Sequence, residues 1–331
     1  MSAASPARPE SPVDVAVAER PLADAPRHDG VSVLIATRDR LPTLRRALAA
    51  VWAQTYPGPM QVVVVFDGPR PDRLDLPAPL RPDRQRLEIR TNQRAPGVAG
   101  ARNTGLATVR HRHVATCDDD DVWLPHRLEA QLAVLAAEQH TVAVGGSVRV
   151  QRHGRSIVRR APLSEVRLAD LLEDRIMELH PSAMLYRTSA LEAIGGWDET
   201  IPGGYAEDYD LLLKLAQRGP IRLVDEVTAD IHWDGGSYFF SRWRMVADAL
   251  TLLLDRYPEF AGAPRGRARI EGQIAFALAA AGDRAGSRVW LERGLQDNPR
   301  EPRLALTRLV LAGLVRAELV QRVLHARGRG I

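Results

Sequence analysis

A run of four consecutive aspartates, residues 118–121, is the feature of this chain that could most directly do chemistry. Four adjacent like charges repel one another, so the run is costly unless a cation, water or hydrogen-bond donors neutralise it. In an extended segment Asp118 and Asp120 would project to the same side, where both carboxylates could face one hard cation that also binds phosphate oxygens. The alternative is an acidic turn in which Asp121 caps the following helix.

The segments before the aspartates predict strands that alternate with helices. The predicted strands are residues 31–36, 61–66, 87–90 and 113–117, and the predicted helices are residues 44–52 and 97–109. The second strand is a valine run, as expected for a parallel strand that is covered on both faces. This alternation implies an open α/β sheet.

Polar clusters follow three of these strands. Residues 37–40, Asp67 and residues 118–121 each come directly after an apolar run. In open α/β sheets ligands collect at the carboxyl ends of the strands. We therefore expect the three clusters to converge on one edge of the sheet and to form a binding site there.

The second half of the chain changes character after residue 143. Strands mixed with loops are followed by a short helix over residues 168–177 and a loop that enters a helix over residues 203–216. Beyond about residue 262 only helices are predicted, and residues 275–299 resemble one tetratricopeptide repeat. A single repeat cannot stack into an array, so it predicts a helical appendage. The predicted domains are a leader, an α/β domain and a helical region, at residues 1–28, 29–261 and 262–331.

Composition excludes several classes of protein. A hydrophobic content of 45% and a charged content of 26% are ordinary for a globular chain. The net charge of +4 comes almost wholly from arginine, since Lys214 is the only lysine. The basic stretches at residues 149–160 and 322–329 lack the interleaved aromatic residues of a stacking platform, which argues against nucleic-acid binding.

Cysteine content and the N-terminal residues bear on location. Cys117 is the only cysteine, so neither an intrachain disulfide nor a thiolate metal cluster can form, and a reducing compartment is expected. Residues 1–27 lack the features of a secretory signal, and no window has the length and apolarity of a membrane span. We expect a cytoplasmic protein, whose basic C-terminal end would permit contact with the inner face of the membrane.

Five motifs together resemble the family 2 glycosyltransferases with the GT-A fold. They are VSVLIATRDR, VVVVFDG, GVAGARNTGLA, CDDDDVWLPHRLE and YAEDYDLLLKL, in the family's order between about residues 31 and 215. The resemblance implies a Rossmann-like, mixed and mainly parallel sheet flanked by helices, with a small all-α C-terminal region. It also implies a nucleotide-sugar donor, Mg²⁺ or Mn²⁺, and an inverting transfer to a hydroxyl group.

On the donor side, the resemblance assigns roles to individual residues. Asp118 and Asp120 match the outer positions of the family's DxD motif, which holds the metal against the donor diphosphate, and Asp121 would be auxiliary. Asp67 matches the aspartate that contacts the nucleobase, although it could instead be a turn former before glycine.

Three basic or polar residues complete the predicted donor side. Thr37 and Arg38 lie where the family contacts the nucleotide, but Arg38-Asp39 replaces the usual Tyr-Asn. Arg102, in the family's ARN motif, could reach a phosphate or fix the acidic cluster. Its alternative is a surface salt bridge of small value.

On the acceptor side, Glu207-Asp208 matches the family's ED motif, in which the aspartate is the general base. Asp208 would take the proton of the acceptor hydroxyl, although Glu207 or Asp210 could occupy that position. The alternative is an acidic first turn that complements the helix dipole. His232 lies where some relatives supply a histidine to the metal or diphosphate, and residues 180–182 lie where relatives shape the acceptor pocket.

Two rival functions remain open at this point. A nucleotidyltransferase would share the sheet and the acidic metal site, but residues 36–39 lack its glycine-rich loop. A catalytically silent sugar-nucleotide binder would use its helical tail to recruit a partner. The acceptor of a transferase could be a saccharide, a lipid-linked molecule or a small molecule, and the C-terminal helices could pack on the domain, form a homodimer or lie on a membrane.

Overall fold

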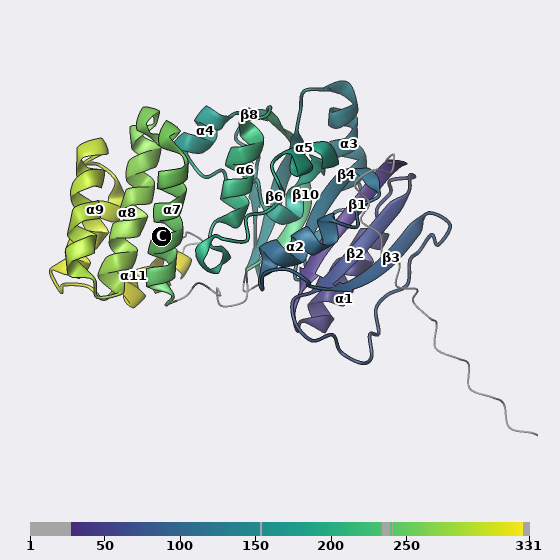
Figure 1. The fold of residues 1–331 in the computed structure, drawn as a ribbon, viewed down its shortest axis with the longest axis horizontal. Coiled ribbons are helices and arrows are strands. Elements are labelled where there is room, and N and C mark those ends of the chain that lie inside the picture. The colour runs from purple at the N-terminus through teal and green to yellow at the C-terminus, as the bar shows by residue number, and fades with distance from the viewer. Residues whose placement is uncertain (1–27, 153, 234–238, 240, 327–331) are drawn as a thin grey trace, which may run out of the picture.

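The computed structural model describes residues 28–152, 154–233, 239 and 241–326, so the predicted leader lies outside the described residues. A central sheet carries helices on both faces, and a group of helices lies at one end of it (Figure 1). The predicted fold class, a mixed and mainly parallel sheet flanked by helices with a C-terminal helical region, is confirmed.

The described strands form one sheet, whose main path has the order β3-β2-β1-β4-β9-β6-β10-β5, while β7 pairs with β6 and β8 with β10. Their bounds are β1 His28–Thr37, β2 Met60–Phe66, β3 Gln85–Thr91, β4 His111–Asp118, β5 Val122–Trp123, β6 Ala143–Arg152, β7 Arg155–Arg159, β8 Glu165–Val166, β9 Leu185–Arg187 and β10 Ile221–His232. Strands β3, β2, β1 and β4 are parallel, and β6 is parallel to β10. Strand β9 runs antiparallel between β4 and β6 and so joins the two parallel parts.

The register of the first strands brings the polar clusters together. Ile35 pairs with Val64 on one side and with Cys117 on the other, and Ala36 pairs with Asp118. The strand ends of β1, β2 and β4 therefore lie side by side. Because every residue of β2 is buried, this part of the sheet is covered on both faces, as the valine run predicts.

Six helices cover the faces of the sheet. They are α1 Leu41–Trp52, α2 Val98–Leu106, α3 Arg127–Ala137, α4 Leu168–Glu173, α5 Thr188–Ala193 and α6 Glu207–Ala216. The apolar stripe of α1 and that of α3 pack on one face, whereas α2, α4 and α6 pack on the other. Helix α4 is shorter than predicted, because Asp174 adopts an extended backbone. Helix α3 begins after His126, so the alternative in which Asp121 caps it is wrong.

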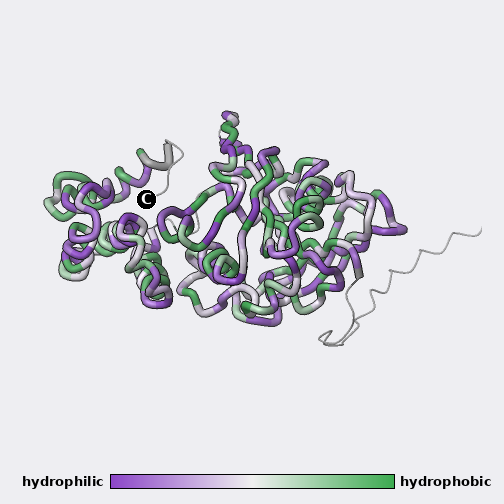
Figure 2. The backbone as a smooth tube through the Cα atoms, turned by 90° about the horizontal axis from the view of Figure 1, so that it is seen from above, coloured by the Kyte–Doolittle hydropathy of each residue, from purple (hydrophilic) through white to green (hydrophobic). Residues whose placement is uncertain are grey.

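Five further helices and three 3₁₀ turns complete the described fold. The helices are α7 Trp243–Arg256, α8 Pro264–Ala280, α9 Arg284–Asp297, α10 Pro302–Leu311 and α11 Ala317–Ala326, and the turns are η1 Pro181–Ala183, η2 Pro202–Gly204 and η3 Pro258–Gly262. Helices α7, α8 and α9 lie side by side (Figure 1). Seen from above, this helical region forms one end of the molecule, and its helices mix hydrophobic with hydrophilic residues (Figure 2).

The helical region shares a hydrophobic core with the α/β part. Ile270 and Phe276 of α8 belong to the same buried cluster as Leu171 of α4 and Tyr209 of α6. Helix α8 therefore packs on the domain that precedes it. Among the described helices, none combines the length and apolarity that crossing a membrane requires.

Candidate active site

The four aspartates leave the end of β4 and alternate in direction, as an extended segment predicts. Asp118 and Asp120 are partly exposed, whereas Asp119 and Asp121 are buried at 0% and 1% exposure. Asp118 and Asp120 line a cavity of about 520 Å³ that Asp67, Arg38, Arg102 and Asp208 also line, among other residues. The polar clusters that the sequence predicts thus share one cavity.

Arg40 binds two of the aspartates. Its guanidinium lies 2.6 Å from the Asp119 carboxylate and 2.5 Å from that of Asp120. The Thr37 hydroxyl donates a 2.6 Å hydrogen bond to Asp119. Burial nevertheless raises the pKa of Asp119 to about 6, against the opposite effects of Thr37 and Arg40. Thr37, a predicted nucleotide contact, therefore holds the acidic loop against β1.

Arg102 on α2 connects the aspartates to α6. Its guanidinium donates a 2.6 Å hydrogen bond to Asp118 and a 2.9 Å hydrogen bond to Glu207. The Arg102 side chain is only 3% exposed, so the alternative of a surface salt bridge is wrong. Burial, together with the charge of Asp208, raises the pKa of Glu207 to about 7, although Arg102 lowers it.

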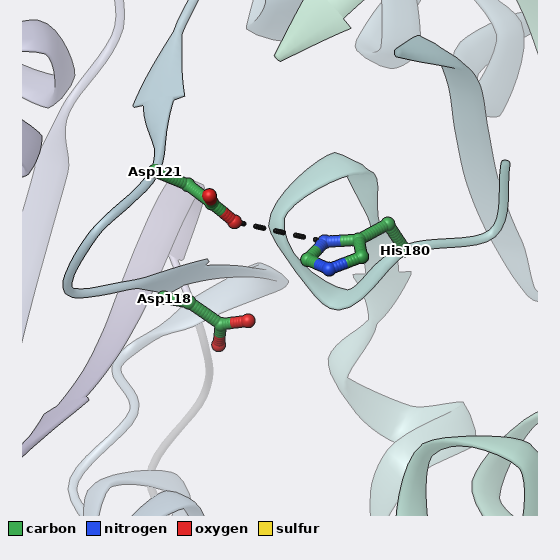
Figure 3. Close-up of side chains that lie close together, drawn as sticks. All are labelled: Asp118, Asp121 and His180. Carbon is green, nitrogen blue, oxygen red and sulfur yellow. Dashed lines mark ion pairs between the residues drawn. The ribbon is translucent and has the colours of Figure 1, made fainter. Parts of the chain in front are cut away.

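Asp118, Asp121 and His180 form a group whose possible ligand atoms all lie within 4.8 Å of one another (Figure 3). Carboxylate oxygens and an imidazole nitrogen are donors that suit a divalent cation such as Mn²⁺. Burial lowers the pKa of His180, which favours the neutral imidazole that a metal requires. The geometry of these three residues therefore fits a metal ion.

Hydrogen bonds already occupy part of this group. The Ser182 hydroxyl and the His232 backbone N–H donate to Asp121, and the Ser182 backbone N–H donates a 3.2 Å bond to the Nδ1 atom of His180. The backbone of His232 thus lies next to the acidic run at residues 118–121. Its Nδ1 atom is buried and lacks a hydrogen-bond partner in the described part of the chain.

Asp67 lies between β2 and the start of α2. Its carboxylate accepts hydrogen bonds of 3.0 Å from the Gly97 N–H and 2.8 Å from the Asn92 amide. Gly97 has a φ of +120°, which favours glycine there. The carboxylate of Asp67 still faces the cavity, and nearby Arg38 has no ion-pair partner among the residues described.

Asp208, the predicted base, lies in the first turn of α6 and contacts Arg175. The same guanidinium nitrogen donates to both carboxylate oxygens at 2.8 and 2.6 Å. Burial by itself would raise the pKa of Asp208, but Arg175 and the Tyr209 backbone N–H outweigh it, so the pKa is lowered. The apolar side chains of Ile176 and Leu179 line the cavity nearby.

Sequence reasoning missed the roles of Arg40, Arg175 and Ser182. Arg40 lies two residues after a predicted contact, so its position in the motif was a usable signal. Arg175 follows α4 and meets a partner 33 residues later, which no local pattern indicates. Ser182 acts through a bond to Asp121 that is also long-range.

Comparison with known proteins gives a family match for residues 32–195, to the model described as "Glycosyl transferase family 2". The amylovoran biosynthesis glycosyltransferase AmsE of Erwinia amylovora is 27% identical over 200 residues, which cover 59% of this chain and 73% of the relative. The pre-mycofactocin glycosyltransferase of Mycobacterium tuberculosis is 29% identical, with coverage of 64% and 46%. The Escherichia coli UDP-Glc:α-D-GlcNAc-diphosphoundecaprenol β-1,3-glucosyltransferase WfgD is 30% identical, with coverage of 32% and 40%. The chain thus spans less than half the length of two of these relatives.

Solved structures share the fold over most of the chain. TarS residues 1–349 of S. aureus, in complex with UDP-GlcNAc, superpose with a TM-score of 0.58 at 17% identity, covering 90% of this chain and 92% of that chain. The mannosyltransferase PcManGT of Pyrobaculum calidifontis, in complex with GDP-Man and Mn²⁺, gives a TM-score of 0.52 at 19% identity, with coverage of 87% and 86%.

Proposed function

Because the chain belongs to glycosyl transferase family 2, we propose that it moves a sugar from a nucleotide-sugar donor to a hydroxyl group with inversion at the anomeric carbon. The observation that carries this proposal is the shared cavity, which Asp118, Asp120 and Asp208 all line. An inverting transfer needs a site for the leaving diphosphate and a base for the acceptor in one cavity, since the acceptor attacks from the side opposite the leaving group.

The donor would bind at the strand ends. Asp67 would accept a hydrogen bond from the nucleobase, and Arg38 would bind the diphosphate, with Thr37 supporting the loop from β1. Arg38 suits this role because it lines the cavity without a carboxylate partner in the described chain. Arg102 would keep the Asp118 carboxylate oriented.

The acidic residues of the cavity would hold Mg²⁺ or Mn²⁺. Asp118 and Asp120 face the cavity, and His180, or His232 from the end of β10, would complete the ligand set. When bound, the cation supplies positive charge for the diphosphate leaving group. Asp121, whose carboxylate lies within 4.8 Å of possible ligand atoms of Asp118 and His180, would be an auxiliary ligand that the Ser182 hydroxyl holds in place.

Asp208 would be the general base. The acceptor oxygen forms a bond to the anomeric carbon while the bond to the diphosphate breaks, and the electron pair of that bond leaves with the nucleoside diphosphate. The hydroxyl proton passes to Asp208. Glu207, whose carboxylate Arg102 binds and whose pKa is raised to about 7, is the alternative base.

The printed names of similar proteins guide the choice of donors and acceptors. WfgD is named for a UDP-glucose donor and a diphosphoundecaprenol acceptor, TarS is solved with UDP-GlcNAc, and PcManGT with GDP-mannose and Mn²⁺. UDP-sugars and GDP-sugars with Mn²⁺ are therefore the first donors to test here, with hydroxyl acceptors that include lipid-linked saccharides.

The decisive experiment combines donor binding with product formation. Thermal unfolding with nucleoside diphosphates and nucleotide sugars, each with and without Mn²⁺, would identify the donor by the rise in apparent stability. Asp208→Asn should abolish transfer and keep the donor-dependent rise, whereas Asp225→Asn, at an exposed carboxylate, should change neither. Full transfer by Asp208→Asn would refute the assignment of the base.

The two rival functions predict different results in the same experiment. A silent binding module would show the stability rise with a nucleotide sugar but neither transfer nor donor hydrolysis. A nucleotidyltransferase would release pyrophosphate from a nucleoside triphosphate and a sugar phosphate.

For the location of the protein, we propose contact with an anionic membrane through the end of the helical region. Leu314, Leu319 and Val323 are exposed there, at 72%, 50% and 43%, beside the exposed side chains of Arg316 and Arg322. This mixture suits a lipid surface, where a lipid-linked acceptor would also lie. Co-sedimentation with anionic vesicles that is lost in Leu314→Ser would support it. A homodimer in light scattering that Leu314→Ser dissociates, without vesicle binding, would overturn it.

A further inference from the structure

The Arg175–Asp208 pair depends on the short segment that carries Arg175. Helix α4 ends at Glu173, and the chain continues through an extended Asp174 to Arg175. From there one guanidinium nitrogen reaches both oxygens of Asp208, at 2.8 and 2.6 Å. The direction of the Asp208 carboxylate is therefore set by where α4 ends.

Helix α8 of the helical region fixes the end of α4. A Cβ atom placed on Gly266 would lie 1.7 Å from the Leu172 carbonyl oxygen and 2.9 Å from the Glu173 Cα atom. Both neighbours are backbone atoms, which cannot rotate away as a side chain can. Leu171 and Leu172 are also buried in the same core as Ile270 of α8. The close approach at Gly266 therefore sets the position of the α4 backbone.

Helix α8 also contacts the residue after Asp208. The Arg269 guanidinium donates a 3.2 Å hydrogen bond to the Tyr209 hydroxyl, and its central carbon lies 5.8 Å from the centre of the Tyr209 ring. The Arg175 guanidinium lies 5.9 Å from the same ring, and the Tyr209 hydroxyl donates to the Leu171 carbonyl of α4. Helices α8, α4 and α6 thus form a closed set of contacts around Asp208.

A second connection runs from the end of α7 to α6. Arg256 and the Tyr257 hydroxyl donate hydrogen bonds of 2.7 and 2.9 Å to Asp210, which is fully buried. Arg256 also lies 2.6 Å from Asp198 in the α/β part. The first turn of α6 is therefore held both by α8 and by the end of α7.

We propose that the helical region is a positioning element of the active site, in which the contact between Gly266 and α4 places Arg175 so that it orients Asp208 toward the acceptor. This inference rests on the proposed role of Asp208 as the base. Arg175 is a positioning residue. The helical region is more than an appendage, because its contacts hold Arg175 and Asp208 in place on the predicted acceptor side of the site.

The test uses the full-length protein and a matched pair of glycine variants. Gly266→Ala should push α4 away from α8, whereas Gly262→Ala meets no atom within 4 Å. Because a displacement of about 1 Å can cost about 100-fold in rate, we expect kcat to fall about 10- to 100-fold in Gly266→Ala with an unchanged KM for the donor. Gly262→Ala should retain wild-type kcat.

Arg175 variants connect this effect to Asp208. Arg175→Met should lower kcat to a similar extent, Arg175→Lys should restore part of it, and the double variant Gly266→Ala/Arg175→Met should be no worse than Arg175→Met alone. Unchanged kcat in Gly266→Ala, or multiplied losses in the double variant, would overturn the inference. If Gly266→Ala does not fold, Arg269→Met tests the same contact set with the same expectations.

Hydrogen exchange separates this inference from the proposed function. Gly266→Ala should speed amide exchange in residues 171–176 and 208–210 relative to Gly262→Ala, whether or not a donor has been found. Faster exchange in a protein that transfers no sugar would refute the proposed function alone. Unchanged exchange in these segments would refute the positioning role.

Discussion

Glu271 allows a quantitative prediction about the stability of the helical region. This side chain of α8 is only 1% exposed, and its carboxylate lies 3.2 Å from Arg267, which also lies 3.1 Å from Asp297 of α9. Burial, followed by the charge of Asp297, raises the pKa of Glu271 from 4.5 to about 7. We predict that Glu271→Gln stabilises the protein at alkaline pH.

The sign follows from the proton balance. A group whose pKa is raised on folding contributes stability below its unfolded pKa, and that contribution is lost as the pH rises through the folded value. The difference of about 2.5 between the two pKa values corresponds to about 3 kcal/mol at 1.36 kcal/mol per pKa unit. Allowing for relaxation around an ionised Glu271, we expect glutamine to raise the free energy of unfolding by about 1–3 kcal/mol above pH 7.5 and by little near pH 4.5.

Urea denaturation at about pH 5 and about pH 8.5 measures this difference directly. Glutamine keeps an oxygen for Arg267 and an N–H for Asp297, so the comparison isolates the ionisation. The exposed Glu292 on α9 provides the control, since Glu292→Gln should show the same small difference at both pH values. A Glu271→Gln variant that is less stable than wild type at the higher pH would refute the reasoning, because Arg267 would then stabilise an ionised Glu271.

Three further predictions concern the site and its support. Asp120→Asn should lower transfer by at least about 100-fold and remove the Mn²⁺-dependent part of the donor-induced rise in melting temperature, and an unchanged Mn²⁺ effect would contradict the metal assignment. Arg38→Met should raise the KM for the donor about 10-fold with kcat retained, because a charged hydrogen bond is lost from binding; steady-state kinetics with Arg94→Met as the control would test this. Arg127→Met should lower the free energy of unfolding by about 3 kcal/mol in urea, because the buried carbonyls of Ser182 and Met184 lose the guanidinium that donates to both. An unchanged midpoint would show that water replaces the guanidinium.

Hydrophobic periodicity was sufficient to predict the strands and the helix next to the predicted donor site. The valine run of β2 is buried as predicted, helix α1 forms over the predicted residues 44–52, and alternation along an extended segment separates Asp118 and Asp120 from their buried neighbours. These features depend on the local geometry of strands and helices, which appears in the sequence as a repeat of about 2 or 3.6 residues. The assignments of Asp118, Asp120, Asp208 and His232 to metal and base remain predictions.

The remaining features depend on contacts between distant segments. Whether helix α4 would end at Glu173 could not be predicted from the local pattern, because the segment after it is drawn toward Asp208. The burial of Arg102 could not be predicted either, since the same residue on an uncovered helix would be exposed. Long-range pairs of charged side chains carry no periodic signal, so three-dimensional packing alone decides them.

The core that joins α8 to α4 and α6 has a consequence for how such chains can be recombined. Cutting the chain before Pro264 would expose the apolar surface around Leu171 and Tyr209 on one fragment and the matching surface of α8 on the other. Because exposed apolar patches of this kind cause aggregation, we expect neither fragment to be soluble alone. Intact protein should accordingly melt in one cooperative transition in calorimetry. A chimaera that exchanges the loops around the predicted acceptor site between two relatives should therefore take α4, α6 and α8 from the same parent.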